Sequence, residues 1–308
     1  MISTKGNFLK MILILGVLAF SAIFPFFAPS YLMELFLSII TYVILVAAWN
    51  ILSGYTGYLF LGTSAFYGLG AYILAYIQGI GVLFAIPIVA IICFIIAFFI
   101  GFPFFRIRGV YFTIASYALS LLFGNLFLYY EQVFKSTTGR TVPIQSSTTI
   151  YTMFVFFAIT TLMVAYLIKR YRLGFGFLII KGNEEVAEVI GVNTVIYKCI
   201  AFGISAAIMG TVGATSILRG GYVDTTIAFG NVISFNTLIM GVLGGLGNIT
   251  GGLISSILLS SLYSLFGTSG DPFTYLIIMG LLTYIIMLVS PKGIGGAIDK
   301  IRLKRKGG

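Results

Sequence analysis

The side chains that could do chemistry in this sequence are few, and the usual catalytic groups are missing. Its 308 residues include only eight acidic side chains and no histidine. Without histidine, serine–histidine triads, H-E-x-x-H zinc sites and histidine proton relays are excluded. The two cysteines, Cys93 and Cys199, lie in separate apolar stretches, which excludes a C-x-x-C metal pair and argues against a structural disulfide. We therefore expect neither an enzyme nor a chain that holds a cofactor or metal.

The one dense group of acids lies in the stretch 182–193, which holds Glu184, Glu185 and Glu188. Asn183 is a favourable N-cap, and acids in a first helical turn interact well with the helix dipole. Gly191 is placed to end the helix. A helix of about two turns is not stable alone in water, so it must dock on something. It is either a connector on the membrane surface or a docking helix for a cytoplasmic partner.

No acid lies near the middle of any apolar stretch. Glu34, Glu131, Asp224 and Asp271 all fall near the ends of such stretches. An ion-coupled carrier commonly keeps a carboxylate at membrane depth, and no G-x-x-x-x-G-K-[ST] phosphate loop is present. If transport is active, its energy must come from another polypeptide. This deduction favours the docking helix over the connector.

Uncharged polar side chains inside the apolar stretches are candidates for a translocation path, because they can hydrogen-bond a solute without a charge penalty. The five residues that we select are Asn50, Ser64, Ser116, Asn125 and Asn236. Hydrogen bonds between helices, worth about 0.6 kcal/mol each, explain such residues equally well.

Composition places these residues in a membrane. The chain is 59% hydrophobic and 8% charged, whereas about a quarter of the residues in a soluble domain are charged. The net charge of +10 does not indicate nucleic-acid binding, because Glu34 is the only charge between Met11 and Phe105. We expect an all-α, polytopic transmembrane helical bundle that forms a single transmembrane domain over residues 1–308.

Uncharged intervals mark the spans, since a charge at the bilayer centre costs about 2.5–3.5 kcal/mol. At about 20 residues per crossing they hold about eight to ten spans. The candidates are 11–28, 35–52, 57–78, 82–105, 110–130, 150–168, 199–217, 231–246, 250–267 and 272–290. The first resembles a signal peptide but is long enough to span uncleaved. The segment 231–246 is short and glycine-rich, so a re-entrant helix is an alternative.

The basic residues predict the orientation. With both termini in the cytoplasm, all but three of the 18 Lys and Arg residues fall on the inner side, as the positive-inside rule requires. The three on the outer side are Lys135, Arg140 and Arg219. The cytoplasmic side then receives a coupling loop, 169–198, and a basic tail, 292–308, that anchors the topology near anionic lipid. This predicts a multi-pass protein of the cell membrane.

Four stretches in order carry a resemblance to a known family. They are Asn50–Gly62 (NILSGYTGYLFLG), Arg108–Phe112 (RGVYF), Lys181–Thr194 (KGNEEVAEVIGVNT) and Gly241–Gly247 (GVLGGLG). Together they resemble the M-type permease subunits of branched-chain amino-acid ABC importers.

The resemblance implies a set of partners. It implies a second, similar permease subunit, two cytoplasmic ATPase subunits that bind the ATP, and an extracytoplasmic binding protein that delivers the solute. It also implies that Glu184, Glu185, Ala187, Glu188 and Gly191 belong to a coupling helix that rides in a cleft of the ATPase.

The solute stays open. A branched-chain amino acid is expected, but the stretch 119–125 lacks an acid that relatives carry, and the loop 138–144 has fewer glycines than theirs. Urea, short amides and other amino acids are therefore alternatives. Outside the family, the alternatives are an ion-driven secondary carrier, a lipid-modifying enzyme and a channel.

Overall fold

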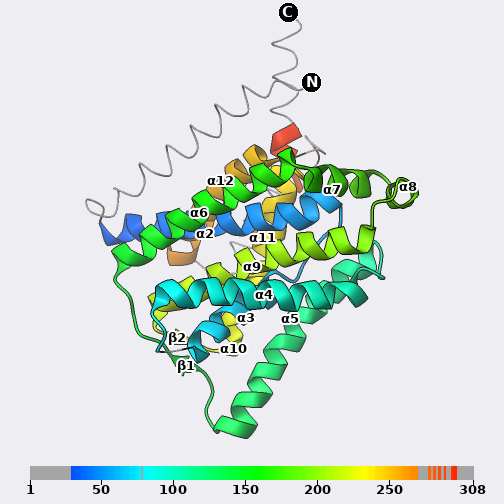
Figure 1. The fold of residues 1–308 in the computed structure, drawn as a ribbon. Coiled ribbons are helices and arrows are strands. Elements are labelled where there is room, and N and C mark those ends of the chain that lie inside the picture. The colour runs from blue at the N-terminus through cyan, green and yellow to red at the C-terminus, as the bar shows by residue number, and fades with distance from the viewer. Residues whose placement is uncertain are drawn as a thin grey trace, which may run out of the picture.

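The computed structural model describes residues 29–77 and 79–269, with short pieces between residues 277 and 296. Over these residues the chain is a helical bundle with one pair of two-residue strands (Figure 1). The expected all-α class is confirmed. The expected crossing 11–28 lies outside the described residues, and 272–290 and the tail 292–308 lie largely outside them.

The elements follow one another in this order. They are α2 (Ser30–Trp49), a π-helical turn η2 (Asn50–Gly54), α3 (Thr63–Tyr76), α4 (Val82–Phe104), α5 (Val110–Tyr130), a second π turn η3 (Glu131–Lys135), β1 (Arg140–Thr141), α6 (Ser147–Arg170), α7 (Arg172–Gly182), α8 (Glu184–Val189), α9 (Thr194–Gly220), β2 (Tyr222–Val223), α10 (Thr225–Ala228), α11 (Asn231–Gly244) and α12 (Ile249–Ser269).

Six helical stretches among the described residues are long and apolar enough to cross a membrane. They are Tyr31–Gly54, Val82–Phe104, Val110–Lys135, Ser147–Arg170, Thr194–Gly220 and Thr225–Gly244. A shorter apolar helix, Ile249–Ser264, adds to them. The chain is therefore a multi-pass membrane protein.

Helix α9 runs through the centre of the bundle, with α3 and α4 against it and α2 and α6 on its other side (Figure 1). Small residues allow the closest approach. A Cβ atom at Gly70 of α3 would overlap the backbone of Gly210 of α9, and one at Gly213 would overlap the Tyr67 carbonyl. Glycines at these positions let two helix backbones touch, as small residues commonly do between membrane helices.

We expect Gly213→Val to destabilise the bundle, since the new side chain cannot enter the α3–α9 contact without separating the helices. Overpacking typically costs about 1–3 kcal/mol, and a clash with backbone belongs at the upper end. Gly220→Val is the matched control, because nothing lies within 4 Å of a Cβ atom at Gly220 in the same helix. Thermal unfolding in detergent checks both variants. Equal melting temperatures for the two would contradict the tight contact.

The bundle has two ends with different groups. At one end β1 pairs with β2 in antiparallel register, Arg140 with Val223, and Glu34 forms an ion pair with Arg219. We call this the ladder end. At the other, the α8 end, Lys181 contacts Gly54 and the turn after α11. Figure 1 shows α8 at the opposite side of the bundle from β1 and β2. Groups expected on one side of the membrane thus lie at one end of the bundle.

The expected crossing 57–78 is not one continuous helix. Residues 57–62 form neither helix nor strand, and helix α3 begins only at Thr63 and has 14 residues. Gly57 has a φ of 84°, which ends the preceding turn, and a Cβ at Gly62 would lie 2.8 Å from the Phe60 ring. We call residues 57–62 the non-helical segment. Two glycines therefore break the helix that apolar composition alone predicts.

The short crossing expected over 231–246 is a single helix, α11, and the short helix α10 precedes it. Asp224 caps α10 through a 2.7 Å hydrogen bond from Ile227 N, and α11 follows after one short turn. The combined stretch Thr225–Gly244 has 20 residues, enough for a crossing.

Candidate coupling site

Helix α8 forms because its ends are capped. The Asn183 side-chain oxygen accepts hydrogen bonds from the backbone N–H groups of Glu185 (2.9 Å) and Val186 (3.3 Å). Gly191 takes a left-handed φ of 85° at the other end, and Val192 N donates to Ala187 O at 2.9 Å. Such caps satisfy the unpaired backbone groups of a helix too short to persist alone. The predicted cap and terminator are both confirmed.

The helix has an inner and an outer face. Ala187 is buried, and Glu188 accepts a 2.9 Å hydrogen bond from the Thr194 hydroxyl at the start of α9. Val186, Val189 and Ile190 are 51%, 86% and 57% exposed. Positions 186, 189 and 190 share one face of a helix. An exposed apolar stripe on a polar loop indicates a surface that another molecule covers.

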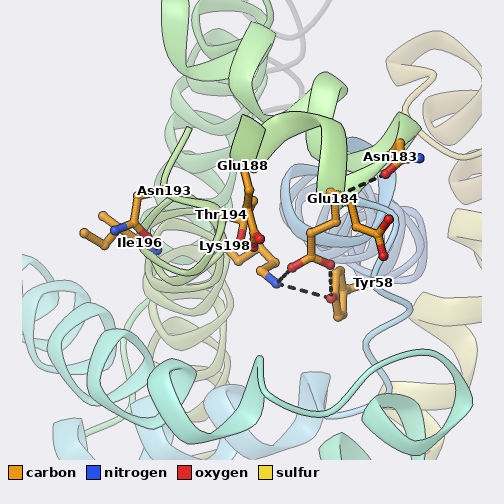
Figure 2. A network of polar contacts seen from close by, with 9 residues as sticks. Tyr58, Asn183, Glu184, Glu188, Asn193, Thr194, Ile196 and Lys198 are labelled. Carbon is orange, nitrogen blue, oxygen red and sulfur yellow. Dashed lines mark hydrogen bonds and ion pairs between the residues drawn. The ribbon is translucent and has the colours of Figure 1, made fainter. Parts of the chain in front are cut away.

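On the inner face, two side chains from outside α8 bind Glu184 (Figure 2). Lys198 of α9 forms an ion pair with Glu184 Oε1, and the Tyr58 hydroxyl donates to Glu184 Oε2 at 2.8 Å. Lys198 Nζ also donates to the Tyr58 oxygen at 3.2 Å. The network joins α8, α9 and the non-helical segment.

Burial makes this network sensitive to the loss of a member. The Lys198 side chain is 0% exposed and that of Glu184 is 16% exposed. The Lys198 ammonium also lies 4.8 Å from the centre of the Tyr58 ring and 5.5 Å from that of Phe105, within cation–π range. A buried charge in this setting is tolerated only while its partner is present.

The charge on Glu184 is favoured by its neighbours. Burial raises the pKa of the Glu184 carboxyl, but hydrogen bonds from Lys198 and Tyr58 outweigh it and leave this pKa below its usual range. Its contribution to stability is therefore complete above the ordinary carboxyl pKa and is lost only as the pH falls through the lowered value. The Glu184 carboxyl group is therefore ionised at neutral pH.

A second anchor lies one turn before α8. Lys181 Nζ donates to the carbonyl of Gly54 at 2.8 Å and to that of Leu246 at 3.2 Å. These carbonyls end η2 and begin the turn between α11 and α12. Burial, with a smaller repulsion from Lys169, lowers the pKa of Lys181. Lys181 thus connects the loop 169–198 to the end of η2 and to the turn between α11 and α12.

The structure places the five predicted path residues in different surroundings. Ser64 N and Oγ bond the Ser234 hydroxyl, and Ser116 Oγ accepts from Leu61 N at 2.8 Å. Asn236 donates to the Tyr42 hydroxyl at 3.1 Å. These three therefore make contacts within the bundle.

The other two path residues lie in different surroundings from these three. Asn125 is exposed on α5. The Asn50 carbonyl oxygen accepts from Gly247 N at 3.0 Å, but its buried Nδ2 has no hydrogen-bond partner among the described residues. The five do not form one cluster.

The five predicted coupling residues divide between the faces of α8. Glu184 and Ala187 lie against the bundle, whereas Glu185, Glu188 and Gly191 are exposed, although Glu188 also accepts the hydrogen bond from Thr194. Sequence reasoning missed the outer apolar residues Val186, Val189 and Ile190, although their spacing of three and four is a helical stripe. It also missed Tyr58 and Lys198, whose partners lie far away in the chain.

These features define a class first: a multi-pass membrane protein with a short, capped helix held outside its spans by buried charge. The chain belongs to the family described as branched-chain amino acid transport system / permease component, whose model matches residues 31–288.

Two curated relatives are similar to the chain over most of its length. One is the high-affinity branched-chain amino acid transport system permease protein LivM of Escherichia coli K12, 24% identical over 285 residues, which cover 81% of this chain and 67% of the relative. The LivM protein of Salmonella typhimurium LT2 is 23% identical with the same coverage. No solved structure matches the chain.

Proposed function

We propose that this chain is the transmembrane permease subunit of an ATP-driven ABC importer for branched-chain or similar small amino acids. It pairs with a second, homologous permease subunit. Two cytoplasmic ATPase subunits bind the ATP, and an extracytoplasmic binding protein delivers the solute. Family membership and the similarity to LivM support this assignment. The proposal puts the α8 end and both termini in the cytoplasm.

One observation carries the proposal: α8 is fixed to the bundle on one face and exposes apolar side chains on the other. Glu184 ties the inner face to Lys198 and Tyr58, whereas Val189 is 86% exposed. A helix that only connected two spans would need no buried ion pair. A helix that transmits force from a partner needs both a rigid attachment and a free contact surface.

The proposal is tested by uptake into proteoliposomes that contain the purified assembly of both permeases and both ATPases. With binding protein outside the vesicles and ATP at the α8 end, we expect labelled leucine to accumulate, and no accumulation with a non-hydrolysable analogue. Urea and acetamide in place of leucine distinguish the alternative solutes. Failure of all three to accumulate would overturn the proposal.

We expect Glu185→Lys to uncouple ATP hydrolysis from uptake while the protein stays inserted. Glu185 is exposed on α8 without a role in its attachment, so reversal of its charge acts on the partner contact. Losing complementary charge costs about tenfold or more in such interfaces. Gly191→Lys should act similarly, because the φ of 85° strains any other residue and distorts the end of α8. The ratio of ATP hydrolysed to leucine taken up measures both, and an unchanged ratio would contradict the docking role.

The proposed orientation predicts which end reagents can reach. Cysteines placed at Arg106 and Lys169 should react with an impermeant maleimide only after the vesicles are opened, because both positions are exposed on the cytoplasmic side in our proposal. A cysteine at the exposed Ile144 of the ladder end should react from outside. Labelling of Arg106→Cys from outside, in sealed vesicles, would show that the orientation in the membrane is the reverse of the proposed one.

A further inference from the structure

The non-helical segment, residues 57–62, lies where the apolar pattern predicts helix and must satisfy its backbone without helical hydrogen bonds. Lipid provides no partners for such groups, so non-helical backbone at membrane depth occurs where protein supplies them or where it lines a path.

Side chains from two neighbouring parts of the bundle supply the missing bonds. Trp49 Nε1 donates to Phe60 O at 2.7 Å, and Phe60 N donates to Ser53 Oγ at 3.1 Å. From α5, the Thr113 hydroxyl donates to Leu59 O at 2.9 Å, and Ser116 Oγ accepts from Leu61 N at 2.8 Å. The segment is thus held by separate hydrogen bonds between neutral groups, rather than by the continuous series of backbone hydrogen bonds that a helix has.

The segment has a glycine at each end and exposed side chains between them. Gly57, with its left-handed φ, lies at one end and Gly62 at the other. Between them Leu59 is 38% exposed and Leu61 is partly exposed. Thr113 and Ser116 hold the segment against α5, and the Ser64–Ser234 hydrogen bond joins the start of α3, which follows the segment, to α11. Among the described residues none fully covers the Leu59 side chain.

The same segment is attached directly to α8. Tyr58 donates to Glu184 and packs its ring edge-on against Phe105 and Phe112, at centroid distances of 5.5 and 5.1 Å. Lys181, in the same loop as Glu184, donates a hydrogen bond to the carbonyl of Gly54, which lies just before Gly57 in the chain. Figure 2 shows Tyr58 and Lys198 both directed at Glu184 below the α8 ribbon. A displacement of α8 must therefore either break the Tyr58 contact or carry the segment with it.

We propose that residues 57–62 are a movable gate of the translocation path, and that Tyr58 is the positioning residue through which α8 moves it. This inference rests on the proposed function, because the motion of α8 comes from the ATPase subunits. Closure of the ATPase pair shifts α8, the Glu184–Tyr58 bond transmits the shift, and the neutral bonds to Thr113 and Ser116 exchange as the segment turns about its two glycines.

The test follows a cysteine in the segment through the ATP cycle. Leu59→Cys is made in a chain whose buried Cys93 and Cys199 are replaced by alanine, and the full assembly is reconstituted in proteoliposomes. The rate of maleimide labelling is compared without nucleotide and with ATP plus vanadate. We expect the two rates to differ about tenfold, within the usual range of coupling between two sites.

Tyr58→Phe then tests the attachment. It keeps the ring contacts with Phe105 and Phe112 and the Glu184–Lys198 ion pair and removes only the hydroxyl, so the bundle should still fold, with only a small fall in melting temperature. We expect the nucleotide-dependent difference at Leu59→Cys to fall below about twofold, the lower edge of measurable coupling. Tyr222→Phe is the matched control, since it removes a hydroxyl bonded to Thr138 O at the ladder end, and should keep the full difference.

Each result decides one statement. An assembly that shows ATP-driven uptake but equal labelling in both states overturns the gate and leaves the proposed function intact. A full difference in Tyr58→Phe overturns the role of Tyr58. Absence of ATP-driven uptake in the unmodified assembly overturns the proposed function itself, and the gate with it.

Discussion

Replacing Glu184 with alanine should destabilise the folded chain by about 3–5 kcal/mol, because it leaves the charge of Lys198 buried without its partner. The Lys198 side chain is 0% exposed, so water cannot replace the carboxylate. Lys198→Met should cost less. The Glu184 carboxylate that remains is 16% exposed and keeps the Tyr58 hydroxyl as a donor. Thermal or denaturant unfolding in detergent measures both changes.

The double variant Glu184→Leu with Lys198→Met separates stability from coupling. Removing both charges eliminates the unpaired ion, so most of the stability should return, as it does when other buried ion pairs are replaced by apolar groups. Uptake should not return, since α8 has lost its tie to Tyr58. Additive losses in the double variant would show that the two residues do not interact. Recovery of uptake together with stability would show that the pair only stabilises the fold.

Replacing Val189 with arginine should remove most of the affinity for the ATPase subunits and leave the fold unchanged. Val189 is 86% exposed, so the substitution creates no clash in the isolated chain. Within an interface it buries a charge at the centre of an apolar stripe shared with Val186 and Ile190. A buried unpaired charge there costs several kcal/mol, which is about a hundredfold or more in affinity.

Binding of purified ATPase to the detergent-solubilised permease pair measures this loss directly. Ile144→Arg is the control, because Ile144 is 71% exposed in the loop at the ladder end, far from α8. It should bind ATPase as the unmodified chain does. Equal affinities for Val189→Arg and the control would mean that the stripe on α8 is not the contact surface.

Local features were predictable from the sequence and contacts between distant residues were not. The cap at Asn183, the acids of the first turn and the terminator Gly191 act within a few residues, and each lies in the structure where the sequence predicts it. The spans α4, α5, α6 and α9 follow in the same way from length and apolar composition.

Lys198 shows where this reasoning stops. The sequence suggests an ordinary inner-side basic residue at the end of a loop, yet its side chain is fully buried against Glu184 and Tyr58. Nothing local marks that pairing, because Tyr58 lies 140 residues away in the chain. The break at Gly57 and Gly62 was missed for a related reason. Its backbone is stabilised by Trp49, Ser53, Thr113 and Ser116, so an apolar count alone predicts a continuous helix.

We propose that this chain is a passive conduit whose energy arrives through α8 from a separate ATPase. The most direct measurement compares leucine accumulation in the same proteoliposomes with two energy sources. One is ATP at the α8 end without any ion gradient, and the other is a proton or sodium gradient without ATP. We predict accumulation of labelled leucine by the full assembly in the first case and none in the second. Accumulation by this chain alone under an ion gradient would contradict the account.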